Sequence, residues 1–185
     1  MTLTLSHDVS ARRLRALTPL PLIALSLTSC GLPKDPDGAT ARIGATHILR
    51  VGISNSPPWA VVDDGQISGI EPDLVRDFAG TLGARVQWVA NGETPLMQAL
   101  ERRQLDLVVG GVTTKSPWTK RLGTSLSYAK TGLVPGGQPG LRQGRQRHVL
   151  LSAPGESQLL LRLDRFLAAA RPRVEQALAR EMPHG

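Results

Sequence analysis

Three short apolar segments, joined by two amphipathic ones, dominate the middle of the chain. These segments cover residues 48–53, 85–89 and 105–109, and each is predicted to be a strand. The first is mostly apolar, which is typical of a strand that is buried on both faces. Pro72 suits the first turn of a helix, and the residues with helical spacing behind it are Leu74, Val75, Phe78 and Leu82. Strands joined by single helices pair in parallel with right-handed crossovers. The sequence therefore predicts an α/β domain, a mostly parallel sheet flanked by helices.

Length and charge narrow the range of partners. At 185 residues the chain has room for one domain, and its formal net charge is +7. The basic residues form no stripe with interleaved aromatic residues, so a nucleic-acid partner is not expected. Two interpretations of the charge stay open, a solvated basic surface or contact with anionic lipid head groups.

The first thirty residues have the features of an export signal. Arg12, Arg13 and Arg15 precede an apolar run at residues 16–27, which is too short and too often interrupted by proline to span a bilayer. The run ends at Leu27-Thr28-Ser29-Cys30, which resembles the lipobox of bacterial lipoproteins. This resemblance implies a signal peptide over residues 1–29 and a lipid on Cys30. The alternative is an ordinary signal peptide that contains a cysteine.

Residues 30–46 contain proline, glycine and charged residues without an apolar period, which predicts a flexible tether. The protein is therefore expected to be exported and membrane-anchored, on the periplasmic or cell-surface face.

Metal and cofactor chemistry is not expected. Cys30 is the single cysteine, which excludes an intrachain disulfide and a cysteine-based metal site. The four histidines are scattered, and no two are spaced by three or four residues.

Turn residues divide the rest of the chain. Asp63-Asp64-Gly65 is predicted to be a turn rather than a catalytic carboxylate pair. A further strand is expected within residues 128–134, and residues 135–147 are expected to be a short linker. Residues 148–152 are predicted to form a strand. A helix with one apolar stripe is predicted to follow it, and a last short helix to begin at Pro172.

An ordered set of short motifs resembles the bacterial extracellular solute-binding proteins of the amino-acid type, family 3, which supply ABC transporters. The matching pieces are residues 49–53, Pro57-Pro58-Trp59, Gly69-Ile70-Glu71-Pro72-Asp73-Leu74, residues 105–113 and Ser127-Tyr128. The resemblance implies one lobe of a type II periplasmic-binding-protein-like fold. It also implies a small polar, amino-acid-like solute as ligand.

The resemblance also implies a set of ligand-binding residues. Trp59 corresponds to the aromatic residue that stacks on the ligand, and Gly111 and Thr113 correspond to donors after the third strand. Glu71, Gly110 and Trp118 complete the expected set. Glycines at a strand end let backbone N–H groups approach a carboxylate. Two plainer interpretations stay open: Trp59 caps the core, and Gly110-Gly111 is only a tight turn.

Two departures from the family bear on function. Trp118 stands where members commonly have an arginine that pairs with the ligand carboxylate, although Lys115, Lys120 or Arg121 are substitutes to consider. The 19 residues 129–147 stand where members build a second lobe. A first lobe over residues 47–134 would then be completed by the returning strand and C-terminal helices of residues 148–185.

The predicted function is solute capture, with reduced binding, in association with an ABC importer permease. A homodimer is compatible with the exposure of the face that meets the second lobe in other family members. The alternative is a membrane-tethered protein–protein interaction module derived from one lobe. An enzyme is not expected, because no carboxylate or histidine constellation stands out. A decayed gene product that folds poorly is the remaining alternative.

Overall fold

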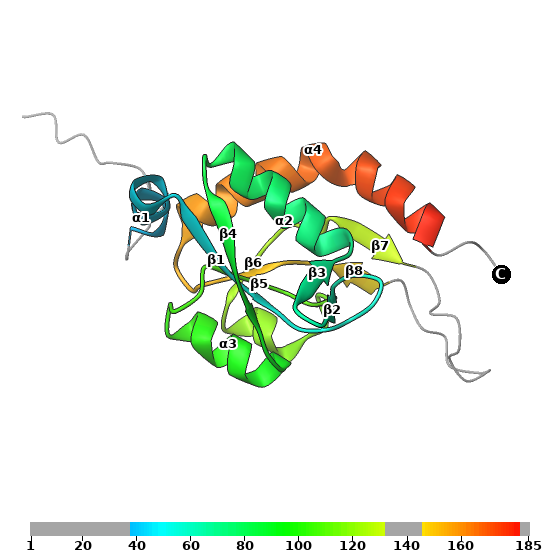
Figure 1. Ribbon diagram of the computed structural model, residues 1–185, viewed down its shortest axis with the longest axis horizontal. Coiled ribbons are helices and arrows are strands. Elements are labelled where there is room, and N and C mark those ends of the chain that lie inside the picture. Colours follow the sequence, from blue (N-terminus) through cyan, green and yellow to red (C-terminus); the bar gives the residue numbers. More distant parts are fainter. Residues whose placement is uncertain (1–37, 132–145, 182–185) are drawn as a thin grey trace, which may run out of the picture. The chain divides into compact units, whose positions relative to one another are not determined.

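The computed structural model describes residues 38–131 and 146–181 (Figure 1). The predicted signal peptide at residues 1–29, the lipidation site Cys30, the start of the tether and most of the linker at 135–147 lie outside the described residues. Among the described helices, none is both long enough and apolar enough to cross a membrane.

A five-stranded sheet forms the centre of the domain, in the order β4-β1-β5-β9-β6. Strand β1 pairs in parallel with both β4 and β5, as predicted, whereas β9 pairs antiparallel with β5 and with β6. The strands are β1 (Ile48–Ile53), β4 (Arg85–Ala90), β5 (Leu107–Val109), β6 (Gly123–Thr124) and β9 (Leu151–Ser152). Because β1, β4 and β5 point the same way, their carboxyl ends meet at one edge of the sheet.

Helices cover both faces of this sheet (Figure 1). One hydrophobic cluster joins α1, α2 and α4 to one face, and a second joins α3 to the other. The helices are α1 (Ala39–Thr46), α2 (Ile70–Thr81), α3 (Glu93–Glu101), the 3-10 helix η1 (Pro117–Lys120) and α4 (Ser157–Glu181). The prediction of a mostly parallel sheet flanked by helices is confirmed.

Alternation along β1 explains how both layers pack. Leu49, Val51 and Ile53 are buried in the cluster that contains α2 and α4. Gly52 faces the other layer, where a Cβ atom would lie 2.8 Å from Leu105 and 2.9 Å from Leu96. The absence of a side chain at Gly52 therefore lets α3 pack closely against the sheet.

Two small antiparallel pairs extend the domain at the carboxyl edge. Strands β2 (Val61–Asp63) and β3 (Gln66–Ser68) are joined by Asp64 and Gly65, both with positive φ, so the predicted turn is confirmed. Strands β7 (Ala129–Thr131) and β8 (Gln146–His148) pair with each other. The segment that leaves the lobe and the segment that returns to it therefore lie side by side.

Three element predictions differ from the structure. Residues 39–46 form α1 within the predicted tether, because Ala39 and Ile43 are buried in the core. The strand predicted at residues 148–152 is divided between β8 and β9. Helix α4 continues through Pro172 rather than restarting there, because Val174 and Leu178 extend its buried stripe beyond the exposed proline.

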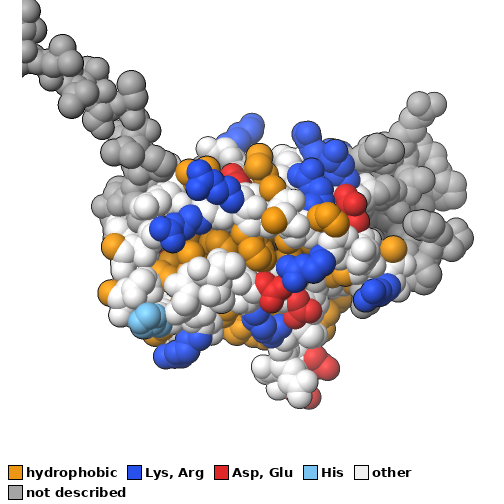
Figure 2. All heavy atoms as spheres, turned by 90° about the horizontal axis from the view of Figure 1, so that it is seen from above, with side chains coloured by type: hydrophobic (Ala, Val, Ile, Leu, Met, Phe, Trp, Pro, Cys, Tyr) orange, Lys and Arg blue, Asp and Glu red, His pale blue; other side chains and the backbone are white. Residues whose placement is uncertain are grey.

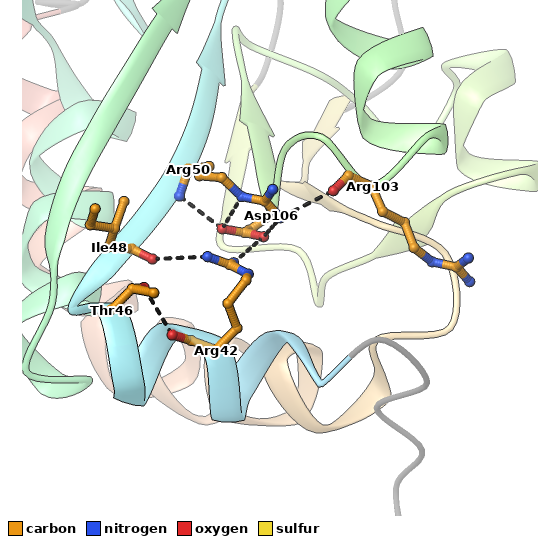
Figure 3. Close-up of polar contacts among 6 residues, drawn as sticks. All are labelled: Arg42, Thr46, Ile48, Arg50, Arg103 and Asp106. Carbon is orange, nitrogen blue, oxygen red and sulfur yellow. Dashed lines mark hydrogen bonds and ion pairs between the residues drawn. The ribbon is translucent and has the colours of Figure 1, made fainter.

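A buried carboxylate fixes α1 to the amino edge of the sheet (Figure 3). Asp106, only 2% exposed, precedes β5 and accepts hydrogen bonds from Arg42 of α1 (2.6 Å) and from the side chain of Arg50 (2.7 and 3.3 Å). The Arg50 backbone N–H adds a bond of 2.8 Å. Every oxygen of this buried charge is therefore satisfied by a charged or backbone donor.

We predict that Asp106→Asn lowers the free energy of unfolding by about 2–4 kcal/mol, because it weakens charge-assisted bonds in a buried site. Denaturant unfolding measures this change. The matched control is Asp77→Asn, which removes the exposed pair with Arg173 (2.8 Å) and should cost no more than about 1 kcal/mol. Equal losses in the two variants would contradict the structural role of Asp106.

Candidate functional site

The carboxyl edge of the sheet brings together the segments that follow β1 and β5. The Ser54 N–H donates to the carbonyl of Val109 (3.1 Å), so the chain after β1 runs beside the end of β5. Gly110 and Gly111 follow directly. Open α/β sheets bind ligands outside the carboxyl ends of their strands, so this edge is the expected place for a ligand.

Both glycines are required by their surroundings. Gly110 and Gly111 have φ values of 149° and 71°. A Cβ atom at Gly110 would lie 1.9 Å from the Ser54 hydroxyl oxygen, and one at Gly111 would lie 2.6 Å from that of Ser56 and 3.0 Å from Trp59 Cδ1. The turn is therefore a close approach of backbone to neighbouring side chains, with both amide groups directed inward.

Glu71 accepts hydrogen bonds from both of these amide groups. It lies in the first turn of α2 and is fully buried. Its Oε2 lies 2.6 Å from the Gly110 nitrogen and 3.0 Å from the Gly111 nitrogen, and its Oε1 accepts from the hydroxyl of Tyr128. The carboxylate thus ties α2, the end of β5 and the segment before β7 together.

Burial and hydrogen bonding act in opposite directions on this carboxyl group. Desolvation raises the pKa of Glu71, while the bonds from Tyr128, Gly111 and Gly110 lower it, and desolvation is the larger effect. Burial also raises the pKa of Tyr128 well above its ordinary value, and the neighbouring Glu71 adds to this shift. The phenol therefore stays a hydrogen-bond donor at neutral pH.

Trp59 lies beside the glycine turn and is largely buried, with 7% of its surface exposed. Its indole ring stacks on the imidazole of His148, with centroids 3.7 Å apart and an interplanar angle of 22°. The rings of Trp59 and Tyr128 form a T-shaped pair with a centroid distance of 6.0 Å. One face of the indole is therefore already covered by a side chain from β8.

His148 is buried as a neutral ring. Its Nε2 lies 3.2 Å from the Thr131 hydroxyl oxygen, and its Nδ1 is buried without a hydrogen-bond partner among the described residues. Burial lowers the pKa of His148 to about 4, and the nearby Gly111 backbone opposes this only in part. A buried imidazole thus fills space against Trp59.

The structure separates the expected ligand-binding residues into two groups. Trp59, Glu71, Gly110 and Gly111 form one cluster, and Thr113 adjoins it through a bridge with His148. Trp118 lies elsewhere, in η1, where its ring packs against the cluster around α3 and the Arg121 guanidinium lies 5.6 Å from its centroid. Ligand binding by any of these residues stays a prediction.

The expected set of ligand-binding residues lacked four contributors to this cluster, one of which is Tyr128, the donor to Glu71. Ser54 and Ser56 meet the glycine turn, and His148 covers the indole. The serines follow a predicted strand end, which was a usable signal. Nothing in the sequence places His148 against Trp59, because the two are far apart in the chain.

A separate groove of about 810 Å³ lies on the face that carries α2 and α4. Figure 2 shows this face from above, where apolar side chains are bordered by arginine and lysine. The groove runs between the Pro57-Pro58 turn, the first half of α2 and the last turns of α4. Among the described residues, no group of three or more His, Cys, Asp or Glu side chains could hold a metal ion.

We predict that Glu71→Leu lowers the free energy of unfolding by about 3–5 kcal/mol, because it leaves two backbone amides and a phenol without an acceptor. Tyr128→Phe removes one of the three bonds and should cost about 1–2 kcal/mol. Denaturant unfolding of both variants makes the comparison. A smaller loss for Glu71→Leu than for Tyr128→Phe would contradict the role of the carboxylate.

The lowered pKa of His148 predicts a loss of stability in mild acid. Since its folded-state pKa of about 4 lies below the ordinary value of 6.5, its contribution is complete above pH 6.5 and is lost as the pH falls toward 4. Between pH 6.5 and pH 4 the free energy of unfolding of the wild type should fall by up to about 3 kcal/mol more than that of His148→Phe. Unfolding at a series of pH values tests this, with the exposed-site variant His47→Asn as control. Parallel pH profiles for wild type and His148→Phe would contradict it.

The fold matches solved structures of solute-binding proteins. The arginine-bound form of domain 1 from TmArgBP is 25% identical, with a TM-score of 0.58 over 69% of this chain and 97% of that one. An ancestral cationic amino acid solute-binding protein is 14% identical, with a TM-score of 0.65 over 77% of this chain and 98% of that one. The predicted fold class, one lobe of a type II periplasmic-binding-protein fold, is confirmed.

Sequence comparison gives a related result. The membrane-bound lytic murein transglycosylase F of Vibrio cholerae is 27% identical over 118 residues, which are 62% of this chain. The chain spans only 22% of the length of that relative. The family model for bacterial extracellular solute-binding proteins, family 3, matches residues 49–175. That match covers more than half of the sequence, so this chain belongs to the bacterial extracellular solute-binding proteins of family 3.

Proposed function

We propose that this domain captures a small polar, amino-acid-like solute at the carboxyl edge of its sheet. The observation that carries the proposal is the convergence of the Gly110 and Gly111 amide groups beside Trp59, in a domain of a solute-binding family. Backbone N–H groups at a strand end bind carboxylates, and an indole binds apolar or cationic groups. An amino acid carries both kinds of group.

In this proposal a single lobe captures the solute without a second one. The solved domain 1 from TmArgBP is described as arginine-bound, and it is matched over nearly its whole length by this chain. That structure supports solute capture without a second lobe. A ligand bound to one lobe buries less of its surface than a ligand enclosed between two lobes, so the affinity should be lower.

Contacts within the domain also favour reduced binding. The Glu71 carboxylate already accepts the two amide bonds that a solute carboxylate would need, and His148 already stacks on Trp59. A solute has to displace one of these contacts or bind at their margin, near Thr113. Each contact that must be broken reduces the net free energy of binding.

We infer that the protein is exported, carries its lipid on Cys30 and works with an ABC importer permease, as is usual for its family. The export features of residues 1–30 and the family membership support this part. We propose binding rather than catalysis, although a relative that shares part of this domain is a transglycosylase.

The groove between α2 and α4 favours a second candidate function, a tethered protein–protein interaction module. Its apolar lining includes Pro57, Pro58, Val61, Ile70 and Leu74, and its volume of about 810 Å³ exceeds what a single side chain fills. This function would leave the carboxyl edge without a ligand.

Calorimetric titration of residues 31–185 with amino acids, opines, polyamines and small carboxylates tests the main proposal. We expect saturable binding of an amino-acid-like solute with a Kd weaker than micromolar, lost in Trp59→Ala. The matched control Trp88→Ala alters a tryptophan of the edge strand β4, under Arg76, and should keep the affinity.

Micromolar or tighter binding would contradict the reduced affinity. Equal affinity in wild type and Trp59→Ala would contradict the site. No binding by any of these compounds, in a domain that unfolds cooperatively, would favour the interaction module.

A further inference from the structure

Arginines from four elements gather at the amino edge of the sheet, opposite the candidate solute site. Because β1, β4 and β5 run in parallel, their first residues share this edge, and the register places Arg85 opposite Ile48. Helix α1 reaches this edge through the bond from Arg42 to Asp106, and the chain just after α3 reaches it where the Arg103 carbonyl accepts a bond from Arg50. We call this set the amino-edge arginine cluster: Arg42, Arg50, Arg85, Arg102 and Arg103.

The cluster presents its charge to the outside. The side chains of Arg42 and Arg50 are 29% and 30% exposed, and Arg85, Arg102 and Arg103 are exposed. The acidic residues beside them face inward, since Asp106 and Glu156 are each 2% exposed. The nearby Glu101 is paired with Arg121 at 2.8 Å. The surface of this edge is therefore positive.

The chain enters the domain at this same edge. Helix α1 begins at Ala39, so that eight residues separate it from Cys30 in the sequence, and it is held by Arg42 and by buried Ile43. A chain spans at most about 3.5 Å per residue, so residues 31–38 reach no further than roughly 28 Å. A lipid on Cys30 would keep the start of α1 within that distance of the bilayer.

We propose that the amino-edge arginine cluster is the surface that this protein lays against anionic lipid head groups. The inference rests on the proposed lipid anchor for the orientation, while the charge of the edge stands without it. Each arginine close to an anionic membrane strengthens binding about fivefold, and the effect falls off within a Debye length. Several arginines on the edge next to the short tether would therefore orient the domain with this edge toward the membrane.

This orientation has a consequence for the candidate solute site. The six residues of β1 separate the two edges of the sheet, which at about 3.3 Å per residue is roughly 20 Å. With the amino edge on the lipid, the edge that contains Trp59 and the glycine turn lies on the side away from the membrane. The membrane then leaves the solute-binding edge accessible.

Vesicle co-sedimentation of residues 31–185 tests the proposal without the anchor. Every residue that the structure describes belongs to one compact unit, residues 31–185. We expect binding to phosphatidylcholine vesicles that contain phosphatidylglycerol, little binding to pure phosphatidylcholine, and weakening by salt. Arg85→Gln with Arg102→Gln should reduce the partition coefficient about 25-fold.

The matched control is Lys130→Gln with Arg180→Gln, which removes the same charge from β7 and from the end of α4. It should change the partition coefficient less than twofold. Equal losses in the two double variants, equal binding to neutral vesicles, or no vesicle binding at low salt would overturn the proposal.

Thermal unfolding checks that both double variants stay folded. Solute titration of the arginine variant separates this inference from the proposed function, because solute binding should be unchanged in it. Vesicle binding without solute binding would contradict the proposed function alone.

Discussion

The carboxylate of Glu71 holds together three parts of the lobe that the chain supplies separately. It accepts hydrogen bonds from Gly110 and Gly111 at the end of β5, and from Tyr128 just before β7, while its own backbone belongs to the first turn of α2. A fully buried charge is costly unless it is hydrogen-bonded, so each of these partners has to be in place. The geometry of the carboxyl edge depends on this one group.

A second buried carboxylate has the corresponding role at the opposite edge. Asp106 precedes the three-residue strand β5, and the glycine turn follows it, so that both ends of this strand meet a buried acid. Asp106 is paired with arginines that reach the solvent, whereas Glu71 is paired with neutral donors. The amino edge consequently gains positive charge at its surface, whereas at the carboxyl edge the buried carboxylate is bonded only to neutral donors.

The pairing of β7 with β8 joins the two described segments on either side of residues 132–145. The leaving strand and the returning strand satisfy each other's backbone groups, and the return carries His148 onto the ring of Trp59. In the proposed function this contact reduces affinity, because the indole face is already used. The same contact contributes to the core, which accounts for the low exposure of both rings.

The sequence by itself determined the alternation of strands and helices from Ile48 to Val109, the turn at Asp64-Gly65 and the family. These features follow from local periodicity, turn residues and motif spacing, which a single chain displays directly. Only the tertiary structure decided that residues 39–46 form a helix, that α4 continues through Pro172, that Glu71 accepts the glycine amides and that His148 covers Trp59. Each of these depends on partners distant in sequence, and burial against such partners outweighs local propensity.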